Sequence, residues 1–95
     1  MRVRYTPRAR SDLDKIHSYL NERSPAAASA VLKRIRNRIE RLADYSLMAP
    51  VTELPGIRGL TILRYPSKAY YRILNDEVVI LHVRDLRRAP WTGES

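Results

Sequence analysis

Two helix-start signals of the same kind divide the first half of the chain. Thr6 and Ser24 are each followed directly by a proline, and a hydroxyl residue at the N-cap with proline at the first helical position favours the start of a helix. Behind each signal, apolar residues recur at steps of three and four: Ala9, Leu13, Ile16 and Leu20, then Ala28, Val31, Ile35, Ile39 and Leu42. The short connection predicts an antiparallel helical hairpin, whose first helix we expect to end near Arg23.

The rest of the chain has the pattern of strands. A short strand is predicted at 2–5, where polar and apolar residues alternate ahead of the first helix. Three further strands are predicted at 60–64, 68–74 and 77–84, and their short connections imply an antiparallel meander. Residues 44–57 contain two prolines and a glycine without periodicity, so they predict an irregular loop. A chain of 95 residues supports one core, so we expect a single α+β domain over 1–95 with a flexible tail at 88–95.

The last predicted strand is an apolar run that ends in positive charge. Val79, Leu81 and Val83 share one face by the period of two, and we expect that face to meet the helices. The other face carries Val78, Ile80, His82 and Arg84. A buried strand fixes the direction of its last side chains, so the basic residues that end this segment form a cluster of fixed orientation.

The charge balance restricts the classes of partner. Eighteen basic residues against 10 acidic ones give a net charge of +8, and 15 of the 18 are arginine, whose planar guanidinium suits phosphates and carboxylates. Such a charge attracts nucleic acid and acidic proteins alike. There is no cysteine, and two histidines are too few for a histidine-built metal centre, so no cofactor is expected. No apolar run is long enough for a membrane span and no secretion signal is present, which predicts a cytoplasmic protein without membrane contact.

The arginines that lie on or near the predicted strands are the candidates for a target-binding surface. The hypothesis brings together Arg58, Arg64, Arg72, His82, Arg84, Arg87, Arg88 and Trp91, with Trp91 supplying apolar contact. The alternative is a sheet edge kept soluble by its charge. The basic residues of the second helix spread around its polar side, so we interpret them as a solvated helix face: Lys33, Arg34, Arg36, Arg38 and Arg41.

In their order and spacing, five segments resemble the RelE/ParE toxins of bacterial toxin–antitoxin pairs. They are the opening Val3–Ala9 with Asp12, Leu13 and Ile16 behind it, then Tyr19-Leu20, Gly56–Arg58, Tyr70–Ile73 and Ile80–Arg84. The resemblance covers nearly the whole chain. It implies a helical hairpin on one face of a small twisted sheet and an antitoxin, often acidic, that wraps the toxin and forms a hetero-oligomer with it.

The resemblance leaves two activities open, because ParE-like members inhibit DNA gyrase and RelE-like members cut mRNA in the ribosome. RelE-like nucleases resemble one another in clustered lysines and arginines on the sheet, with a tyrosine or a histidine-tyrosine pair close to the C-terminus. Here Trp91 is the only aromatic residue after Arg84, and Lys68 the only lysine after Lys33. We therefore favour the ParE-like branch, a gyrase-binding toxin neutralised by a cognate antitoxin, over the ribosome-dependent endoribonuclease. A non-toxic basic binding module is the further alternative.

A nuclease needs groups that move protons and cations that hold the phosphate. His82 is the candidate proton carrier, with Arg64, Arg72 and Arg84 on the phosphate and help from Glu53 or Tyr71. We favour a structural role instead, in which His82 is a partly buried strand residue, hydrogen-bonded to the backbone.

The loop at 44–57 has more apolar residues than a surface loop needs. Tyr45, Leu47, Met48 and Val51 either cap the core or form a docking patch for the antitoxin. We favour capping of the core.

Overall fold

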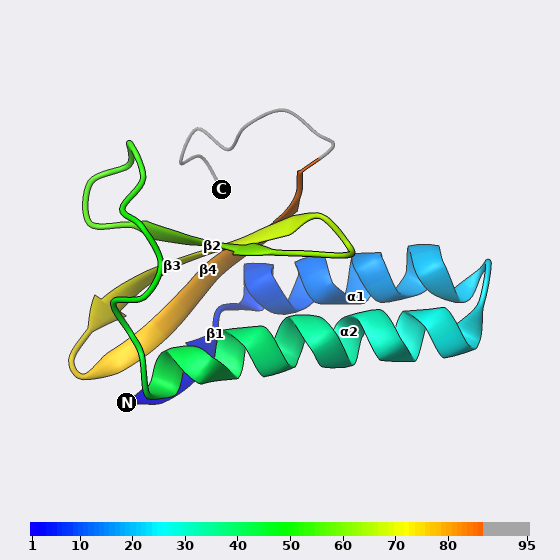
Figure 1. Cartoon of the computed structure of the whole chain (residues 1–95), viewed down its shortest axis with the longest axis horizontal. Coiled ribbons are helices and arrows are strands. Elements are labelled where there is room, and N and C mark those ends of the chain that lie inside the picture. The colour runs from blue at the N-terminus through cyan, green and yellow to red at the C-terminus, as the bar shows by residue number, and fades with distance from the viewer. Residues whose placement is uncertain (87–95) are drawn as a thin grey trace.

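The computed structural model describes residues 1–86, which fold into two helices and a four-stranded sheet (Figure 1). In chain order the elements are β1 (Arg2–Tyr5), α1 (Pro7–Asn21), α2 (Pro25–Glu40), the 3-10 turn η1 (Arg41–Ala43), β2 (Arg58–Ile62), β3 (Ser67–Leu74) and β4 (Glu77–Asp85). Arg87, Arg88, Trp91 and the predicted tail at 88–95 lie outside the described residues. Within residues 1–86, neither helix combines the length and the apolar character needed to cross a membrane.

Both helices start where the sequence predicts. The Thr6 hydroxyl accepts a hydrogen bond from the Ala9 N–H at 3.1 Å, and the Ser24 hydroxyl accepts one from the Ala27 N–H at 3.2 Å. Helix α1 ends at Asn21, slightly before the predicted Arg23. The two helices pack against each other as the predicted hairpin.

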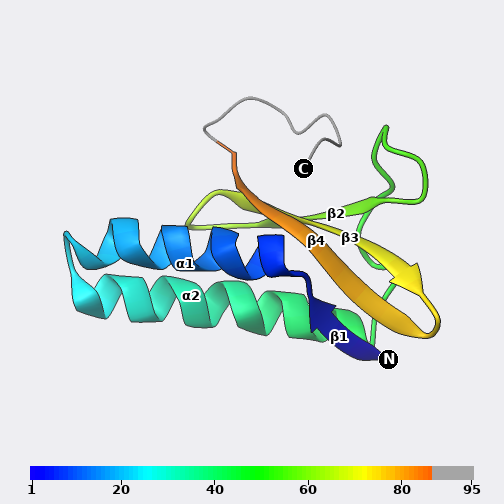
Figure 2. The same cartoon turned by 180° about the vertical axis from the view of Figure 1, so that it is seen from behind.

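The sheet has the strand order β1-β4-β3-β2. The predicted antiparallel meander is confirmed, because β3 pairs with both β2 and β4 in antiparallel register. Strand β1 lies parallel to β4, with Arg2 opposite Glu77 and Tyr5 opposite Ile80 (Figure 2). Strand β2 spans 58–62 instead of the predicted 60–64, because Arg64 has a left-handed backbone with φ 76° that cannot continue a strand.

The helices cover one face of the twisted sheet, and the hydrophobic core fills the space between the two layers (Figures 1 and 2). The arrangement confirms the α+β architecture. The largest fully buried side chains of the core come from both layers: Leu13, Ile35, Ile39, Leu42, Ile62, Tyr71, Val78 and Ile80. We call this face of the sheet the inner face and the opposite one the outer face.

The predicted assignment of the β4 faces is wrong for Val79 and Leu81 and right for Val83. Val78 and Ile80 belong to the core on the inner face, whereas Val79 and Leu81 do not. Tyr71 pairs with Ile80 but Tyr70 pairs with His82, so Leu81 is an extra residue in a β-bulge. The bulge reverses the alternation, and Val83 therefore also contacts the core.

Candidate functional site

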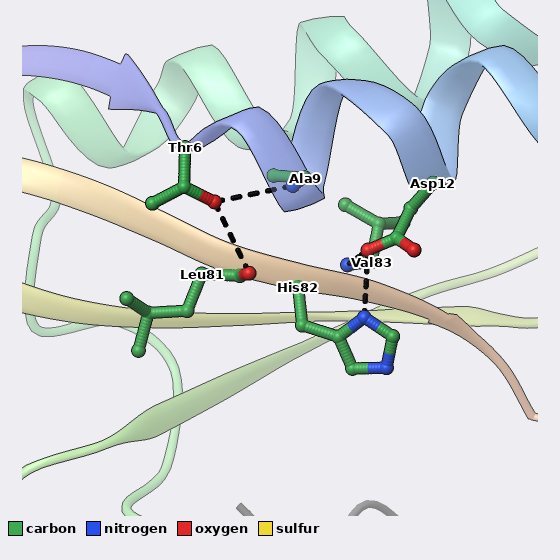
Figure 3. Close-up of polar contacts among 6 residues, drawn as sticks. All are labelled: Thr6, Ala9, Asp12, Leu81, His82 and Val83. Carbon is green, nitrogen blue, oxygen red and sulfur yellow. Dashed lines mark hydrogen bonds and ion pairs between the residues drawn. The ribbon is translucent and has the colours of Figure 1, made fainter. Parts of the chain in front are cut away.

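The site begins with a carboxylate of α1 that reaches β4. Asp12 Oδ2 lies 2.6 Å from His82 Nδ1 and accepts a hydrogen bond from the Val83 N–H at 2.9 Å (Figure 3). The side chains of His82 and Asp12 are only 12% and 14% exposed. One oxygen thus holds two groups of the strand, and it fixes the orientation of the imidazole.

The start of α1 is fastened to the bulged part of β4. The Thr6 N–H donates to the Ile80 carbonyl at 3.1 Å, and the Thr6 hydroxyl donates to the Leu81 carbonyl at 3.2 Å (Figure 3). The same hydroxyl caps the helix at Ala9. Because β1 pairs with β4 only as far as Ile80, α1 takes over the edge of β4 beyond that point and brings Asp12 to residues 82 and 83.

On the outer face, His82 stacks against Tyr70 between two cations. The two rings are 6.0 Å apart between centroids and inclined by 12°. Arg84 Nη1 donates to the Tyr70 hydroxyl at 3.1 Å, and Lys68 Nζ lies 5.5 Å from the centre of the same ring. Tyr70 is only 5% exposed, so its ring serves as a rigid support for the charged groups around it. We call Lys68, Tyr70, His82 and Arg84 the outer-face cluster.

Gly59 of β2 makes room for this cluster, and Arg72 of β3 lies beside it on the same face. A methyl group at Gly59 would overlap the Lys68 side chain, so the glycine leaves the space through which the lysine passes. Ala69 and Tyr71 face the core, so by the period of two Arg72 lies on the outer face with Lys68 and Tyr70. Arg72 is exposed and lies two residues beyond Tyr70 along β3.

The outer-face cluster is suited to binding anions. It contains two permanent cations and an imidazole held by a carboxylate, and such groups attract phosphates or carboxylates. Access to His82 is restricted, because its side chain is only 12% exposed. No group of three histidine, cysteine, aspartate or glutamate side chains within residues 1–86 is placed to hold a metal ion.

The structure does not gather all the predicted target-binding arginines on one surface. Arg72 and Arg84 lie on the outer face, with His82 beside Arg84. Arg58 instead donates to the Ala49 carbonyl at 2.7 Å and so fastens the loop that precedes β2. Arg64 lies in the turn after β2, beside α2. The sequence places all these arginines on or near strands, but it does not show which of them reach the outer face. That depends on the paths of the loops before and after β2.

Two of the residues considered for proton transfer have other surroundings than predicted. His82 bonds to a side-chain carboxylate, although we expected a backbone partner. Tyr71 is fully buried in the core, and its hydroxyl donates to the Ser46 carbonyl at 2.7 Å. Burial raises the pKa of the Tyr71 phenol above its ordinary value. Tyr71 therefore anchors the loop and does not assist His82.

The favoured prediction that the loop at 44–57 caps the core is wrong for its large apolar residues. The exposed fractions are 57% for Tyr45, 65% for Leu47, 39% for Met48 and 70% for Val51. Ala49 is the apolar loop residue that joins the core. These four side chains form an exposed apolar set, which we call the loop patch, on a loop fastened by Arg58 and Tyr71.

Three residues of the site were missed by sequence reasoning. Asp12 and Tyr70 appeared only as parts of segments that carry a resemblance, and Lys68 appeared only in a count of lysines. A signal for Asp12 was available, because it lies three residues after Ala9 and four before Ile16, on the apolar stripe of α1. A carboxylate in that position needs a buried partner. Nothing in the sequence indicated that Lys68 would cross Gly59 to reach Tyr70.

Comparison with known proteins gives consistent similarities. The model of the family described as the ParE toxin of the type II toxin–antitoxin system parDE matches residues 3–90. A putative toxin, Y4kP of Sinorhizobium fredii, is 32% identical over 79 residues, which cover 83% of this chain and 82% of that protein. The toxin RelE3 of Caulobacter vibrioides is 34% identical over 85 residues, which cover 86% of this chain and 90% of that protein.

Two solved structures share the fold. A chain of the chromosomal ParDE system of P. aeruginosa superposes with a TM-score of 0.81 at 28% identity, covering 90% of this chain and 95% of that one. A chain of the intact E. coli RelBE toxin–antitoxin complex gives a TM-score of 0.69 at 11% identity, covering 92% of this chain and 98% of that one. The second similarity concerns the fold alone.

Proposed function

This chain belongs to the ParE toxin family of type II toxin–antitoxin systems, and on that premise we propose that it arrests growth by binding DNA gyrase and is neutralised by a cognate antitoxin. The similarity to a ParDE chain, in sequence as well as in fold, supports the choice of branch. The RelBE chain supports only the architecture. The choice of a binding activity over RNA cleavage rests on the surroundings of His82.

The observation that carries the proposal is the restraint on His82. A ribonuclease of this type needs an accessible group that exchanges protons with the RNA. His82 is 12% exposed, bonded to Asp12 and stacked on Tyr70, so it is arranged as part of a rigid support. A rigid support with an exposed cation, Arg72, at its rim suits binding to an acidic protein surface, which favours a binder over a nuclease.

Charge reversal on the outer face tests the target surface. The variant Lys68→Glu/Arg72→Glu places two carboxylates where the proposed surface has cations, and we expect at least a tenfold loss of gyrase inhibition in a supercoiling assay. The control Arg10→Glu/Lys15→Glu changes the net charge equally at exposed positions of α1. Equal loss in both variants, or no loss in either, would exclude a specific outer-face contact.

The loop patch is the proposed apolar part of the antitoxin interface. Its side chains are exposed while their backbone is fastened at Ser46 and Ala49, so an antitoxin would meet a surface that is already ordered. The Arg41 guanidinium lies 5.8 Å from the centre of the Tyr45 ring and adds positive charge beside the patch. An amphipathic, acidic antitoxin segment complements both properties. Leu47→Asp/Val51→Asp should abolish neutralisation but leave growth arrest intact.

The second candidate is a ribosome-dependent endoribonuclease, which the composition of the outer-face cluster favours. A carboxylate-held imidazole next to a tyrosine hydroxyl and two cations contains the groups needed for attack by a 2′-hydroxyl. Incubation with translating ribosomes distinguishes the candidates. Codon-positioned mRNA cuts that disappear in His82→Ala would establish the nuclease and overturn gyrase binding as the activity. Normal growth during expression without antitoxin would instead identify a non-toxic basic module.

A further inference from the structure

A surface hollow of about 300 Å³ lies between α2 and the end of β2. It is lined by Arg34 and Arg38, which are one helical turn apart on α2, and by residues 61–64. None of the lining residues is acidic. Within residues 1–86, no ion pair or side-chain hydrogen bond joins Arg34, Arg38 or Arg64 to another residue. Three like charges around one hollow repel each other, and a bound anion would relieve that repulsion.

The position of Arg64 is maintained against a local conformational preference. Its φ of 76° lies in the left-handed region, which disfavours residues with a side chain and favours glycine. The turn formed by 63–66 extends from β2 and β3 toward the helix layer (Figure 1). Arg64 adds a third arginine to the lining of the hollow, from the turn after β2, beside the two from α2.

The same hollow borders an open edge of the sheet. Strand β2 is the last in the order, and its first half is covered by the chain itself: the Gly59 N–H donates to the Pro50 carbonyl at 3.1 Å, and Val51 forms a bridge with Arg58. Because the Gly59 N–H points away from β3, the backbone groups of Thr61 also point away from it by the period of two. No backbone of residues 1–86 pairs with this outward side of Thr61.

We propose that an extended acidic protein segment binds here, adding its backbone to the open edge at Thr61 and placing its carboxylates against Arg34, Arg38 and Arg64. This inference deepens the proposed antitoxin binding and rests on it. Val51 of the loop patch lies along the same edge, so one segment that follows β2 would reach both places. A second copy of this chain is disfavoured, because it would bring the arginines of both copies together.

An acidic peptide fits this place better than a nucleic acid does. The outward backbone groups of Thr61 are a donor and an acceptor at the spacing of a strand, which matches another strand. Leu63 is 76% exposed beside the arginines, and an apolar side chain of a peptide would cover it. A phosphate backbone would use the three arginines but leave both of these features unmatched.

The probe is an acetylated ten-residue peptide that alternates glutamate and threonine, titrated into the isotope-labelled protein and followed by NMR. We expect the amide signals of Thr61, Leu63 and Arg64 to shift. Arg34→Glu/Arg38→Glu should weaken binding at least tenfold, whereas the equally charged control Arg10→Glu/Lys15→Glu should retain most of it. Equal weakening in both variants would mean that net charge alone attracts the peptide, and the site would be rejected.

Two further probes separate backbone pairing from simple attraction between charges. The same peptide with alternate amide nitrogens methylated keeps its carboxylates but cannot form a strand, and it should bind at least tenfold more weakly. Undiminished binding of that peptide would overturn the edge pairing. Tighter binding of inorganic phosphate or of a ten-nucleotide thymidine oligonucleotide at the same amides would identify a phosphate site instead.

The inference and the proposed function fail in different ways. Growth arrest and gyrase inhibition test the toxin, and Arg34→Glu/Arg38→Glu leaves the proposed target surface on the outer face unchanged. A variant that still arrests growth but no longer binds the acidic peptide supports the inference. If the wild-type chain binds the peptide at Thr61 but does not arrest growth, the proposed toxin activity is rejected and the proposed binding site is retained.

Discussion

Two sets of arginines in this chain have the same charge but different surroundings. Arg58 and Arg84 are held by hydrogen bonds to a loop carbonyl and to the Tyr70 hydroxyl. Arg34, Arg38 and Arg64 surround a hollow with no ion pair or side-chain hydrogen bond to any residue in 1–86. Arg58 fastens a loop and Arg84 is fixed within the outer-face cluster, whereas the second set has no such contact within residues 1–86. A high count of arginines therefore says less about binding than the contacts of each one.

The largest expected effect concerns the carboxylate that restrains the outer-face cluster. Asp12→Ala removes the acceptor of both His82 and the Val83 N–H, and hydrogen bonds to a charged group contribute about 1.5–3 kcal/mol each. We expect the free energy of unfolding to fall by about 3 kcal/mol in urea denaturation. Asp14→Ala, at an exposed position of the same helix, is the control and should change it by less than about 0.5 kcal/mol. Similar losses of stability in both variants would contradict the role of Asp12 as the acceptor that holds His82 and the Val83 N–H.

The comparison between the arginine sets is tested directly by two alanine substitutions. Arg58→Ala leaves the Ala49 carbonyl without its donor and loosens the loop, so it should lower the free energy of unfolding by about 2 kcal/mol. Arg38→Ala removes no such contact and should stay within about 0.5 kcal/mol of wild type. Thermal or urea unfolding measures both. Equal destabilisation would mean that the two sets do not differ.

Arg64→Gly should separate stability from binding. Glycine adopts the left-handed backbone of this turn without strain, so we expect the free energy of unfolding to rise by about 1 kcal/mol. The same change removes one guanidinium from the hollow and should weaken the acidic peptide several-fold. Arg64→Lys is the control that keeps both the charge and the strain. A glycine variant that binds as tightly as wild type would exclude Arg64 from the site.

The smallest expected effect involves the tyrosines that burial affects. Burial raises the pKa of both Tyr5 and Tyr71, and Glu40 beside the Tyr5 hydroxyl adds to the rise. A raised pKa in the folded state gives stability that is complete below the unfolded value of about 10 and is lost as the pH rises above it. Tyr5→Phe/Tyr71→Phe should therefore show a shallower decline of stability between about pH 10 and 11. An unchanged slope of stability against pH would mean that Tyr5 and Tyr71 do not cause the decline.

Much of the fold was predictable because its signals are local. The hydroxyl–proline pairs at Thr6 and Ser24 mark helix starts whatever the rest of the chain does, and the caps form as expected. The Asn75-Asp76 turn has positive φ values of 50° and 60°, as a tight hairpin requires. Alternation predicted the strands but not the bulge at Leu81, because an inserted residue leaves no mark in an all-apolar run.

The site was less predictable, because it depends on contacts between distant residues. His82 and Asp12 are 70 positions apart, and their pairing follows from how α1 lies across the end of β4. Arg58 seemed equivalent to Arg72 in sequence, yet one binds a loop carbonyl and the other is exposed. The hollow beside α2 combines residues that sequence analysis assigned to a solvated helix face and to a strand. Only the folded chain brings them together.

The parallel pairing of β1 with β4 has a consequence for how this protein is made. The strand at 2–5 leaves the ribosome before all other elements, but its partner at 77–85 leaves after them. The helical hairpin is local and can assemble on the nascent chain, whereas the sheet cannot close until translation of β4 is complete. His82 and Arg84, both on that late strand, are thus among the final groups to reach their places during biosynthesis.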